Sequence, residues 1–132
     1  MSTINDLHKY SDRLNVLYVE DDENLRAETA TLFKMFFKNL DTAEDGLRGL
    51  EAFNENFYDL VISDVNMPNM DGITLTKELR TLPAYKFTPI LTLTTESSAD
   101  KKAAGKQAGA TGWIVKPFNP DQLLATVKKV LG

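Results

Sequence analysis

The stretch Val16-Leu17-Tyr18-Val19-Glu20-Asp21-Asp22 places four apolar residues directly before three acidic ones. Three other apolar runs also end at a polar residue: Leu60-Val61-Ile62-Ser63 before Asp64, Ile90-Leu91-Thr92-Leu93 before Thr94, and Trp113-Ile114-Val115 before Lys116. Helix-length segments separate these runs, an alternation typical of a parallel α/β sheet. Ligands of such sheets bind beyond the carboxyl ends of the strands. We therefore expect these polar side chains to meet at one edge.

The chain is expected to alternate strand and helix five times. The expected strands are 15–19, 39–43, 59–63, 89–94 and 112–115, and the expected helices are 23–38, 45–55, 72–80, 98–108 and 120–131. Helical spacing assigns core positions to two helices: Leu25, Leu32, Met35 and Phe36 in the first, and Leu123, Leu124, Val127, Val130 and Leu131 in the last. Helix 98–108 has few large apolar side chains, so it should bury little surface. We expect either a mobile helix that can occupy two positions or a surface helix of marginal stability.

The composition favours one globular domain over residues 1–132, with a polar extension at 1–13 and a core at 14–131. No apolar run approaches the roughly 20 residues that span a bilayer, and no apolar signal segment opens the chain. With no cysteine, disulfides and thiolate metal sites are excluded. We expect a cytoplasmic protein that does not contact membranes.

Charge is unevenly distributed along the chain. Residues 1–80 hold 16 acidic against 8 basic side chains, whereas residues 81–132 hold 3 against 7, and the net charge is −4. This acidic balance argues against direct nucleic-acid binding, which needs a basic surface. The basic second part is either a docking surface or a set of solvated helix faces.

Glu20, Asp21 and Asp64 would bring three carboxylates into one pocket, which is unfavourable without a cation. Oxygen ligands alone favour Mg²⁺ over Zn²⁺, and the only imidazole, His8, lies in the polar start of the chain. A carboxylate beside Mg²⁺ and the ammonium of Lys116 can act as a nucleophile toward phosphorus. Asp64 is the candidate because a turn-forming stretch follows it directly.

Four blocks of the sequence resemble the blocks of two-component receiver domains, most closely the CheY group of chemotaxis regulators. They are Val19–Asp22, Asp64–Gly72, Thr94–Glu96 and Ala108–Phe118, in the family's order and spacing. The resemblance covers roughly residues 14–131. It implies a bacterial phosphorelay protein with a five-stranded parallel sheet in the order 2-1-3-4-5 and five flanking helices.

The resemblance also implies a role for each site residue. Asp64 would accept a phosphoryl group from a histidine kinase, and Thr94 and Lys116 would bind its oxygens. Asp21, Asp64 and the backbone carbonyl of Asn66 would bind Mg²⁺, with Glu20 acting through water. The Lys116–Pro117 bond would be cis, and Asp22 and Asp71 would be structural.

Activation in the family moves the hydroxyl at Thr94 and turns an aromatic residue inward, here Trp113. The alternative is that Trp113, which is larger than the usual tyrosine or phenylalanine, stays a fixed surface ring. Asn66 and Glu96 are placed to orient a water that removes the phosphoryl group. Thr95 is bulkier than the residue common there, so we expect slower self-dephosphorylation than in CheY.

The downstream partner would dock on helix 98–108, strand 112–115 and helix 120–131, where Lys101, Lys102, Lys106, Lys128 and Lys129 favour an acidic protein. The chain is a stand-alone regulator, a receiver from a longer DNA-binding regulator, or an engineered join. A second class, a haloacid dehalogenase-type phosphatase, needs an acid two residues after the nucleophile, where this chain has Asn66. A flavodoxin-like cofactor binder needs a phosphate-binding loop after the first strand, where three acids stand.

Overall fold

A computed structural model describes residues 14–94 and 99–131. Five parallel strands form one sheet in the order β2-β1-β3-β4-β5. The strands are β1 (Asn15–Val19), β2 (Asn39–Ala43), β3 (Leu60–Asp64), β4 (Ile90–Thr94) and β5 (Gly112–Val115). The predicted strand order is confirmed, and each predicted strand lies within one residue of its observed bounds.

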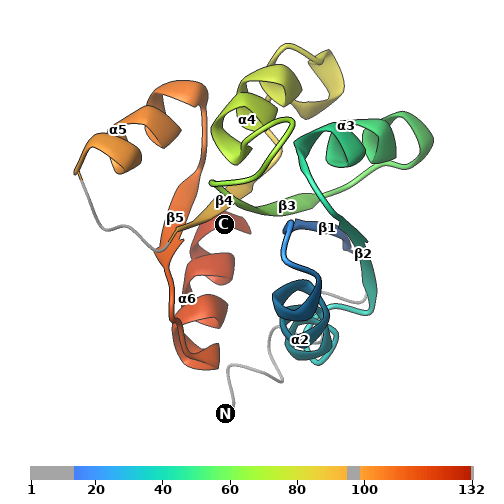
Figure 1. Ribbon diagram of the computed structural model, residues 1–132, viewed down its shortest axis with the longest axis vertical. Coiled ribbons are helices and arrows are strands. Elements are labelled where there is room, and N and C mark those ends of the chain that lie inside the picture. Colours follow the sequence, from blue (N-terminus) through green and yellow to red (C-terminus); the bar gives the residue numbers. More distant parts are fainter. Residues whose placement is uncertain (1–13, 95–98, 132) are drawn as a thin grey trace.

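Helices cover both faces of the sheet (Figure 1). α2 (Glu23–Phe33) and α6 (Pro120–Leu131) lie on one side, and α3 (Gly46–Glu55), α4 (Gly72–Arg80) and α5 (Ala99–Ala108) lie on the other. A short 3-10 turn, η1 (Pro83–Tyr85), follows α4. The fold is thus the doubly wound α/β sheet that the alternation of apolar runs predicted.

The strands bury alternate residues in two separate cores. Val16 and Tyr18 of β1 belong to the core beneath α2 and α6, whereas Leu17 and Val19 belong to the core beneath α3 and α4. This follows from the period of two residues in a strand. β3 is buried along its whole length because it is central and covered on both faces.

The first helix differs from its prediction. The expected helix 23–38 ends at Phe33, after which Met35 and Phe36 donate backbone hydrogen bonds to residues three positions earlier. Of the predicted core stripe, Leu25 and Met35 are 37% and 59% exposed. Phe36 of the same stripe is buried as predicted, and Leu32 packs against the core. The other buried positions are Ala30, Phe33 and Phe37. The aromatic rings take the core because Phe33 packs edge-to-face on Tyr18, with ring centroids 4.9 Å apart.

The last helix follows its predicted pattern. Leu123, Leu124 and Val127 are fully buried, and Val130 and Leu131 pack against the same core. Asn119 accepts a hydrogen bond from the backbone of Gln122, so it caps the helix that begins at Pro120. Asp121 lies in the first turn, where the helix dipole favours a negative charge.

Several sequence-based predictions concern residues outside the described part of the chain. They are the extension at residues 1–13 with His8, and the Thr95 and Glu96 roles in dephosphorylation. The predicted two-position behaviour of α5 is a statement about motion and stays a prediction. Within 14–94 and 99–131, no helix is both long and apolar enough to cross a membrane.

A pair of glycine substitutions tests the packing of the sheet edge. A Cβ at Gly72 would overlap the backbone carbonyl of Asp64, whereas a Cβ at Gly105 in α5 has its nearest neighbour 3.9 Å away, at Thr92 Oγ1. Gly72→Ala should therefore lower the free energy of unfolding by about 1–3 kcal/mol. Gly105→Ala should raise it by about 0.5–1 kcal/mol, because alanine is the better helix former. Urea unfolding measures both changes, and equal changes in the two variants would contradict this packing.

Candidate functional site

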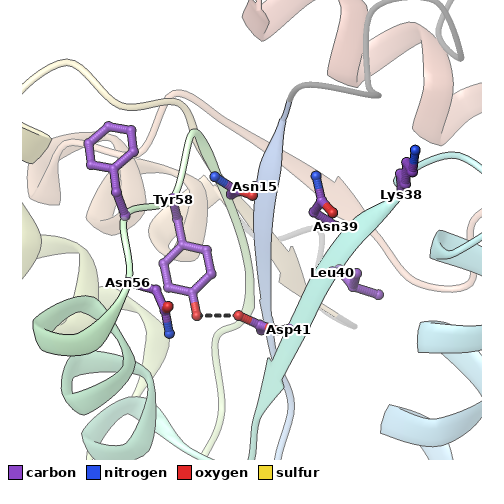
Figure 2. A pocket seen from close by; sticks show the side chains of 8 residues that line it. Asn15, Lys38, Asn39, Leu40, Asp41, Asn56 and Tyr58 are labelled. Atoms are coloured by element: carbon purple, nitrogen blue, oxygen red, sulfur yellow. Dashed lines mark hydrogen bonds between the residues drawn. The ribbon is translucent and has the colours of Figure 1, made fainter.

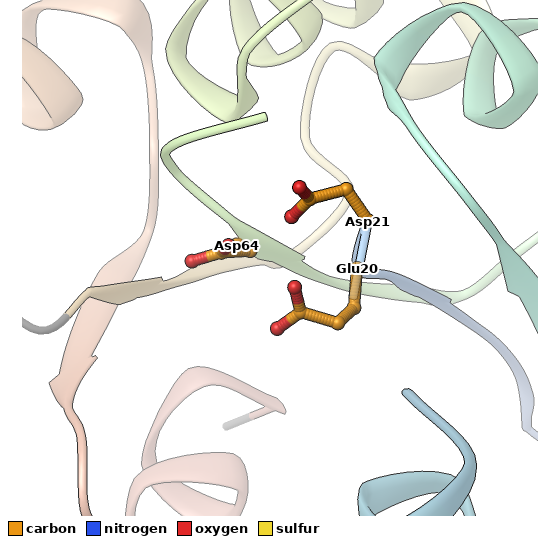
Figure 3. A group of neighbouring side chains, drawn as sticks. All are labelled: Glu20, Asp21 and Asp64. Atoms are coloured by element: carbon orange, nitrogen blue, oxygen red, sulfur yellow. The ribbon is translucent and has the colours of Figure 1, made fainter. Parts of the chain in front are cut away.

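Three carboxylates meet at the carboxyl edge of the sheet. Glu20 and Asp21 follow β1, and Asp64 ends the neighbouring strand β3, where Val19 pairs with Ser63. Each of the three residues offers an oxygen, and these oxygens lie within 4.8 Å of one another. Figure 3 shows the three side chains converging from the two strand ends. Glu20 and Asp64 are buried, and Asp21 is exposed, so the cluster opens to solvent on one side.

Lys116 supplies the positive charge of this site. Its Nζ donates to Glu20 Oε1 at 2.9 Å and to Asp64 Oδ1 at 3.3 Å. Its backbone N–H donates to the carbonyl of Thr94, which continues the pairing of β5 with β4 beyond the strand end. The Lys116–Pro117 bond is cis, as the resemblance implied. The ammonium therefore bridges two acids that lie 44 residues apart in the sequence.

The electrostatics follow from this geometry. Burial alone would lower the pKa of Lys116, but its hydrogen bond to Glu20 and the charge of Asp64 more than offset burial, so the pKa is raised. Partial removal from water and the neighbouring Glu20 carboxylate raise the pKa of Asp21. One ammonium thus faces three carboxylates, so the site carries an excess of negative charge, to which the exposed Asp21 contributes.

Thr94 lies at the same edge, at the end of β4, and is 3% exposed. Asp64 pairs with Leu93 in the sheet, so Thr94 is one position beyond the neighbour of Asp64. Trp113 lies on β5 opposite Thr92 and is 42% exposed, with Lys102 Nζ 5.1 Å from its ring centroid. Thr94 therefore lies at the strand end next to Asp64, and Trp113 is partly exposed on β5, with a lysine of α5 over its ring.

The segment Val65–Asp71, between β3 and α4, lies at the carboxyl edge of the sheet. Val65 N–H donates to Asp64 Oδ1 at 3.0 Å, which fixes the carboxylate from its own backbone. Asp71 accepts from Thr74 N–H and caps α4, as Asp22 accepts from Leu25 N–H and caps α2. The predicted structural roles of Asp22 and Asp71 are confirmed. Asn66 lies exposed in this segment, and the ligand role of its carbonyl stays a prediction.

Sequence reasoning missed three residues around the site. Arg26 donates to the carbonyls of Glu20 and Asp21 at 2.9 and 3.4 Å and so holds the turn that carries both acids. Asp45 at the start of α3 accepts from the side chain of Asn69 at 2.8 Å. The pair Asp45-Gly46 carries a helix-start signal. Nothing in the sequence pairs it with Asn69, which is 24 residues away.

A hollow of about 460 Å³ lies at the opposite edge of the sheet, where β1 and β2 begin (Figure 2). Its lining includes Asn15, Asn39 and Tyr58, and the Tyr58 hydroxyl donates to Asp41 Oδ2 at 2.7 Å. Burial and this bond raise the pKa of Tyr58. The hollow is polar and lies away from the acids, so this hollow and the acid cluster are at opposite edges of the sheet.

The strand order β2-β1-β3-β4-β5 and the acid cluster at the carboxyl edge of the sheet together define the class of protein. The family model for the response regulator receiver domain matches residues 16–128. The chain therefore belongs to this family, as the resemblance implied: it is a receiver domain of two-component response regulators, a family of signalling phosphoacceptors. A phosphatase of the haloacid dehalogenase type is not favoured.

Individual proteins of the family agree with this assignment. The chemotaxis response regulator CheY4 of Vibrio cholerae is 47% identical, with 89% of this chain and 98% of that chain covered and a TM-score of 0.80. The response regulator TrrA of Thermotoga maritima, solved in complex with Mg(2+)-BeF, is 34% identical, with 89% and 98% covered and a TM-score of 0.75. The response regulator ArlR of Staphylococcus aureus is 34% identical over 116 residues, 88% of this chain. The chain spans about half the length of the curated relatives it matches.

The excess charge of Asp21 has a consequence for stability. A raised pKa means that this carboxyl contributes most to stability below about pH 3.9 and that the contribution is lost as pH rises through the folded-state pKa. In EDTA at pH 7, Asp21→Asn should therefore raise the free energy of unfolding, by less than about 1 kcal/mol because the group is largely exposed. The gain should vanish near pH 3.

Urea unfolding of parent and variant at both pH values measures this effect. Glu23→Gln, an exposed acid in the first turn of α2, is the matched control and should not stabilise the protein at pH 7. A lower stability of Asp21→Asn at pH 7 without metal would contradict the crowding of these carboxylates.

Proposed function

We propose that this receiver domain accepts a phosphoryl group on Asp64 from a histidine kinase, in a Mg²⁺-dependent reaction. The family implies a histidine kinase as donor and a downstream effector. The observation that carries the assignment to Asp64 is its position: a buried carboxylate at a strand end, 3.3 Å from an ammonium and beside two other acids. This position supports Asp64 as the nucleophile, with a cation and oxygen ligands for a metal ion beside it.

The donor set fits a hard divalent cation. It consists of carboxylate oxygens only, and no histidine or cysteine contributes among the described residues. Asp21 and Asp64 would bind Mg²⁺ directly, Glu20 through water, and the Asn66 carbonyl would complete the protein ligands. When bound, the metal ion neutralises charge on the phosphoryl oxygens. TrrA was solved with Mg(2+)-BeF, which supports the same metal here.

The two oxygens of Asp64 have different surroundings. Oδ1 accepts from Val65 N–H and from Lys116 Nζ. We assign the attack to Oδ2: a new O–P bond forms, the N–P bond of the phosphohistidine breaks, and the donor nitrogen keeps the electron pair. Lys116 and the hydroxyl of Thr94 then bind the transferred phosphoryl oxygens. The domain in this way assists its own phosphorylation.

The domain also assists loss of the phosphoryl group in this proposal. The side chains of Asn66 and Glu96 would orient a water in line with the acyl phosphate, and Thr95 would screen the phosphorus. Slower self-dephosphorylation than in CheY stays a prediction, and comparable rates for Thr95→Ala and the parent would count against it. A cytoplasmic location likewise stays a prediction from the sequence.

The output face consists of α5, β5 and α6 in this proposal. A hollow of about 490 Å³ on it is lined by Trp113, Thr126, Lys129, Val130 and their neighbours. Lys106 and Lys129 are exposed there, and Lys102 lies over Trp113. Movement of Thr94 toward the phosphoryl group would allow Trp113 to turn inward and change this face; the alternative is that Trp113 stays fixed. Lys101 belongs to the same helix, but its side chain is outside the described part.

Incubation with Mg²⁺ and acetyl phosphate tests the phosphoacceptor. Intact mass should rise by one labile phosphoryl group in the parent and not in Asp64→Asn, because the amide is not a competent nucleophile. EDTA should abolish the gain. Asp59→Asn, at the other end of β3, is the control and should be phosphorylated like the parent. A mass gain that survives Asp64→Asn would contradict the assignment.

Trp113 fluorescence during the same reaction tests the switch. We expect a change on phosphorylation in the parent that is absent in Asp64→Asn and reduced in Thr94→Ala, since Thr94 links the phosphoryl group to β5. A full mass gain without any fluorescence change would support the fixed ring instead.

Charge reversal tests the acidic partner. Lys106→Glu with Lys129→Glu should weaken binding to the downstream protein by roughly 3- to 30-fold, as expected for losing two exposed charge pairs of about 0.2–1 kcal/mol each and adding repulsion. Lys34→Glu with Lys38→Glu, on the α2 side, makes the same change in net charge and should have little effect. If binding changes neither with salt concentration nor in the variant with Lys106→Glu and Lys129→Glu, the partner does not dock through an acidic surface.

A further inference from the structure

Asn69, in the segment that follows the phosphoacceptor, has an unusual backbone conformation. Its φ is 68°, in the left-handed region, and it is the only non-glycine residue with positive φ in the described part of the chain. Met70 N–H donates to the carbonyl of Pro68 at 2.7 Å, so Asn69 is the centre of a γ-turn. With positive φ this turn is rare and strained, and such conformations persist only where the surroundings impose them.

The surroundings that impose it belong to the start of α3. Asp45 Oδ2 accepts from Asn69 Nδ2 at 2.8 Å, and Gly46 N–H donates to the carbonyl of Met70 at 3.1 Å. A Cβ at Gly46 would overlap that carbonyl, so only glycine allows the approach. The turn is therefore clamped by one side-chain bond and one backbone bond.

The other end of the segment is fixed against Asp64 itself. Gly72 N–H donates to the carbonyl of Val65 at 2.9 Å, and Gly72 packs on the backbone of Asp64. Asn66 lies between these two fixed ends. Its carbonyl is the proposed third protein ligand of Mg²⁺, so the place of this ligand depends on both ends of the segment.

We propose that Asp45 is a positioning residue for the phosphoacceptor site, acting through Asn69 to hold the Val65–Asp71 segment in the conformation that binds Mg²⁺. This inference rests on the proposed function. It assigns to α3, which contributes no proposed ligand, a role in metal affinity. The side chain of Asp45 hydrogen-bonds Arg48 and Asn69, neither of which is a proposed metal ligand, so its effect must pass through the turn.

The environment of Asp45 suits this role. The residue is 7% exposed, and its two oxygens have separate tasks: Oδ1 accepts from Arg48 N–H at 2.8 Å and caps α3, and Oδ2 accepts from Asn69. Burial alone would raise its pKa, but these bonds more than offset burial and lower it. Asp45 is thus held as a carboxylate, an acceptor to both partners.

Exchanging the two side chains tests the proposal. Asn69→Asp sets two carboxylates against each other, and aspartate tolerates positive φ, so the hydrogen bond is lost without a new backbone restriction. We expect Mg²⁺ affinity, measured by calorimetry, to fall about 10-fold, although the added negative charge alone would raise it. The double variant Asp45→Asn with Asn69→Asp restores a donor facing an acceptor at unchanged net charge, and affinity should return to within about 2-fold of the parent.

Amide hydrogen exchange of the metal-free proteins gives a second readout. Exchange over residues 65–72 should be faster in Asn69→Asp and return to the parent rate in the double variant. Asn54→Asp, an exposed change on α3 with the same added charge, is the control. Its Mg²⁺ affinity should equal or exceed that of the parent, and its amide exchange over residues 65–72 should be as slow as in the parent.

Parent-like affinity and exchange in Asn69→Asp would overturn the proposal, and so would a double variant no better than Asn69→Asp. If the parent itself bound no Mg²⁺ and accepted no phosphoryl group, the proposed function would fail instead. The exchange experiment would still show whether Asp45 orders the segment.

Discussion

The contact of Lys116 Nζ with Glu20 and Asp64 is the interaction on which the rest of the site depends. It joins the ends of three strands, β1, β3 and β5, through one partly buried ammonium. Removing one partner of a buried ion pair costs about 3–5 kcal/mol, because the other charge is left without compensation. The ammonium offsets part of the repulsion between the three carboxylates, and a bound metal ion would offset more of it.

Much of this arrangement could be predicted from sequence because it follows from short-range rules. Apolar runs with β-rich composition locate the strands, and a parallel sheet carries their carboxyl ends to one edge, so Asp64, Thr94 and Lys116 had to be neighbours. The first helix shows the limit. Its helical spacing assigned Leu25 and Met35 to the core, but both are exposed, because the packing of Phe33 on Tyr18, which lies on another element, decides which residues are buried. The Asp45–Asn69 bond is also beyond sequence reasoning, since it depends on where two loops meet.

The residues around the site divide between those that would touch the phosphoryl group and those that hold them in place. Asp64, Lys116 and Thr94 are in the first group in our proposal. Arg26 holds the turn of Glu20 and Asp21, and Asp45 holds the turn beyond Asn66. Both supports come from helix starts beside β1 and β2, away from the proposed output face at β5. These two supports therefore lie on the β1–β2 side of the sheet edge, whereas Trp113, half-exposed, lies on the β5 side.

The central claim is that the transferred phosphoryl group is on the carboxylate of Asp64. Borohydride reduction of the freshly phosphorylated domain tests it most directly, because hydride converts an aspartyl phosphate into homoserine. Peptide mapping should find homoserine at position 64, and only when Mg²⁺ and the phosphodonor are both present. Homoserine at Asp21 or at any other acid, or none at all in a protein that has gained the phosphoryl mass, would contradict the account.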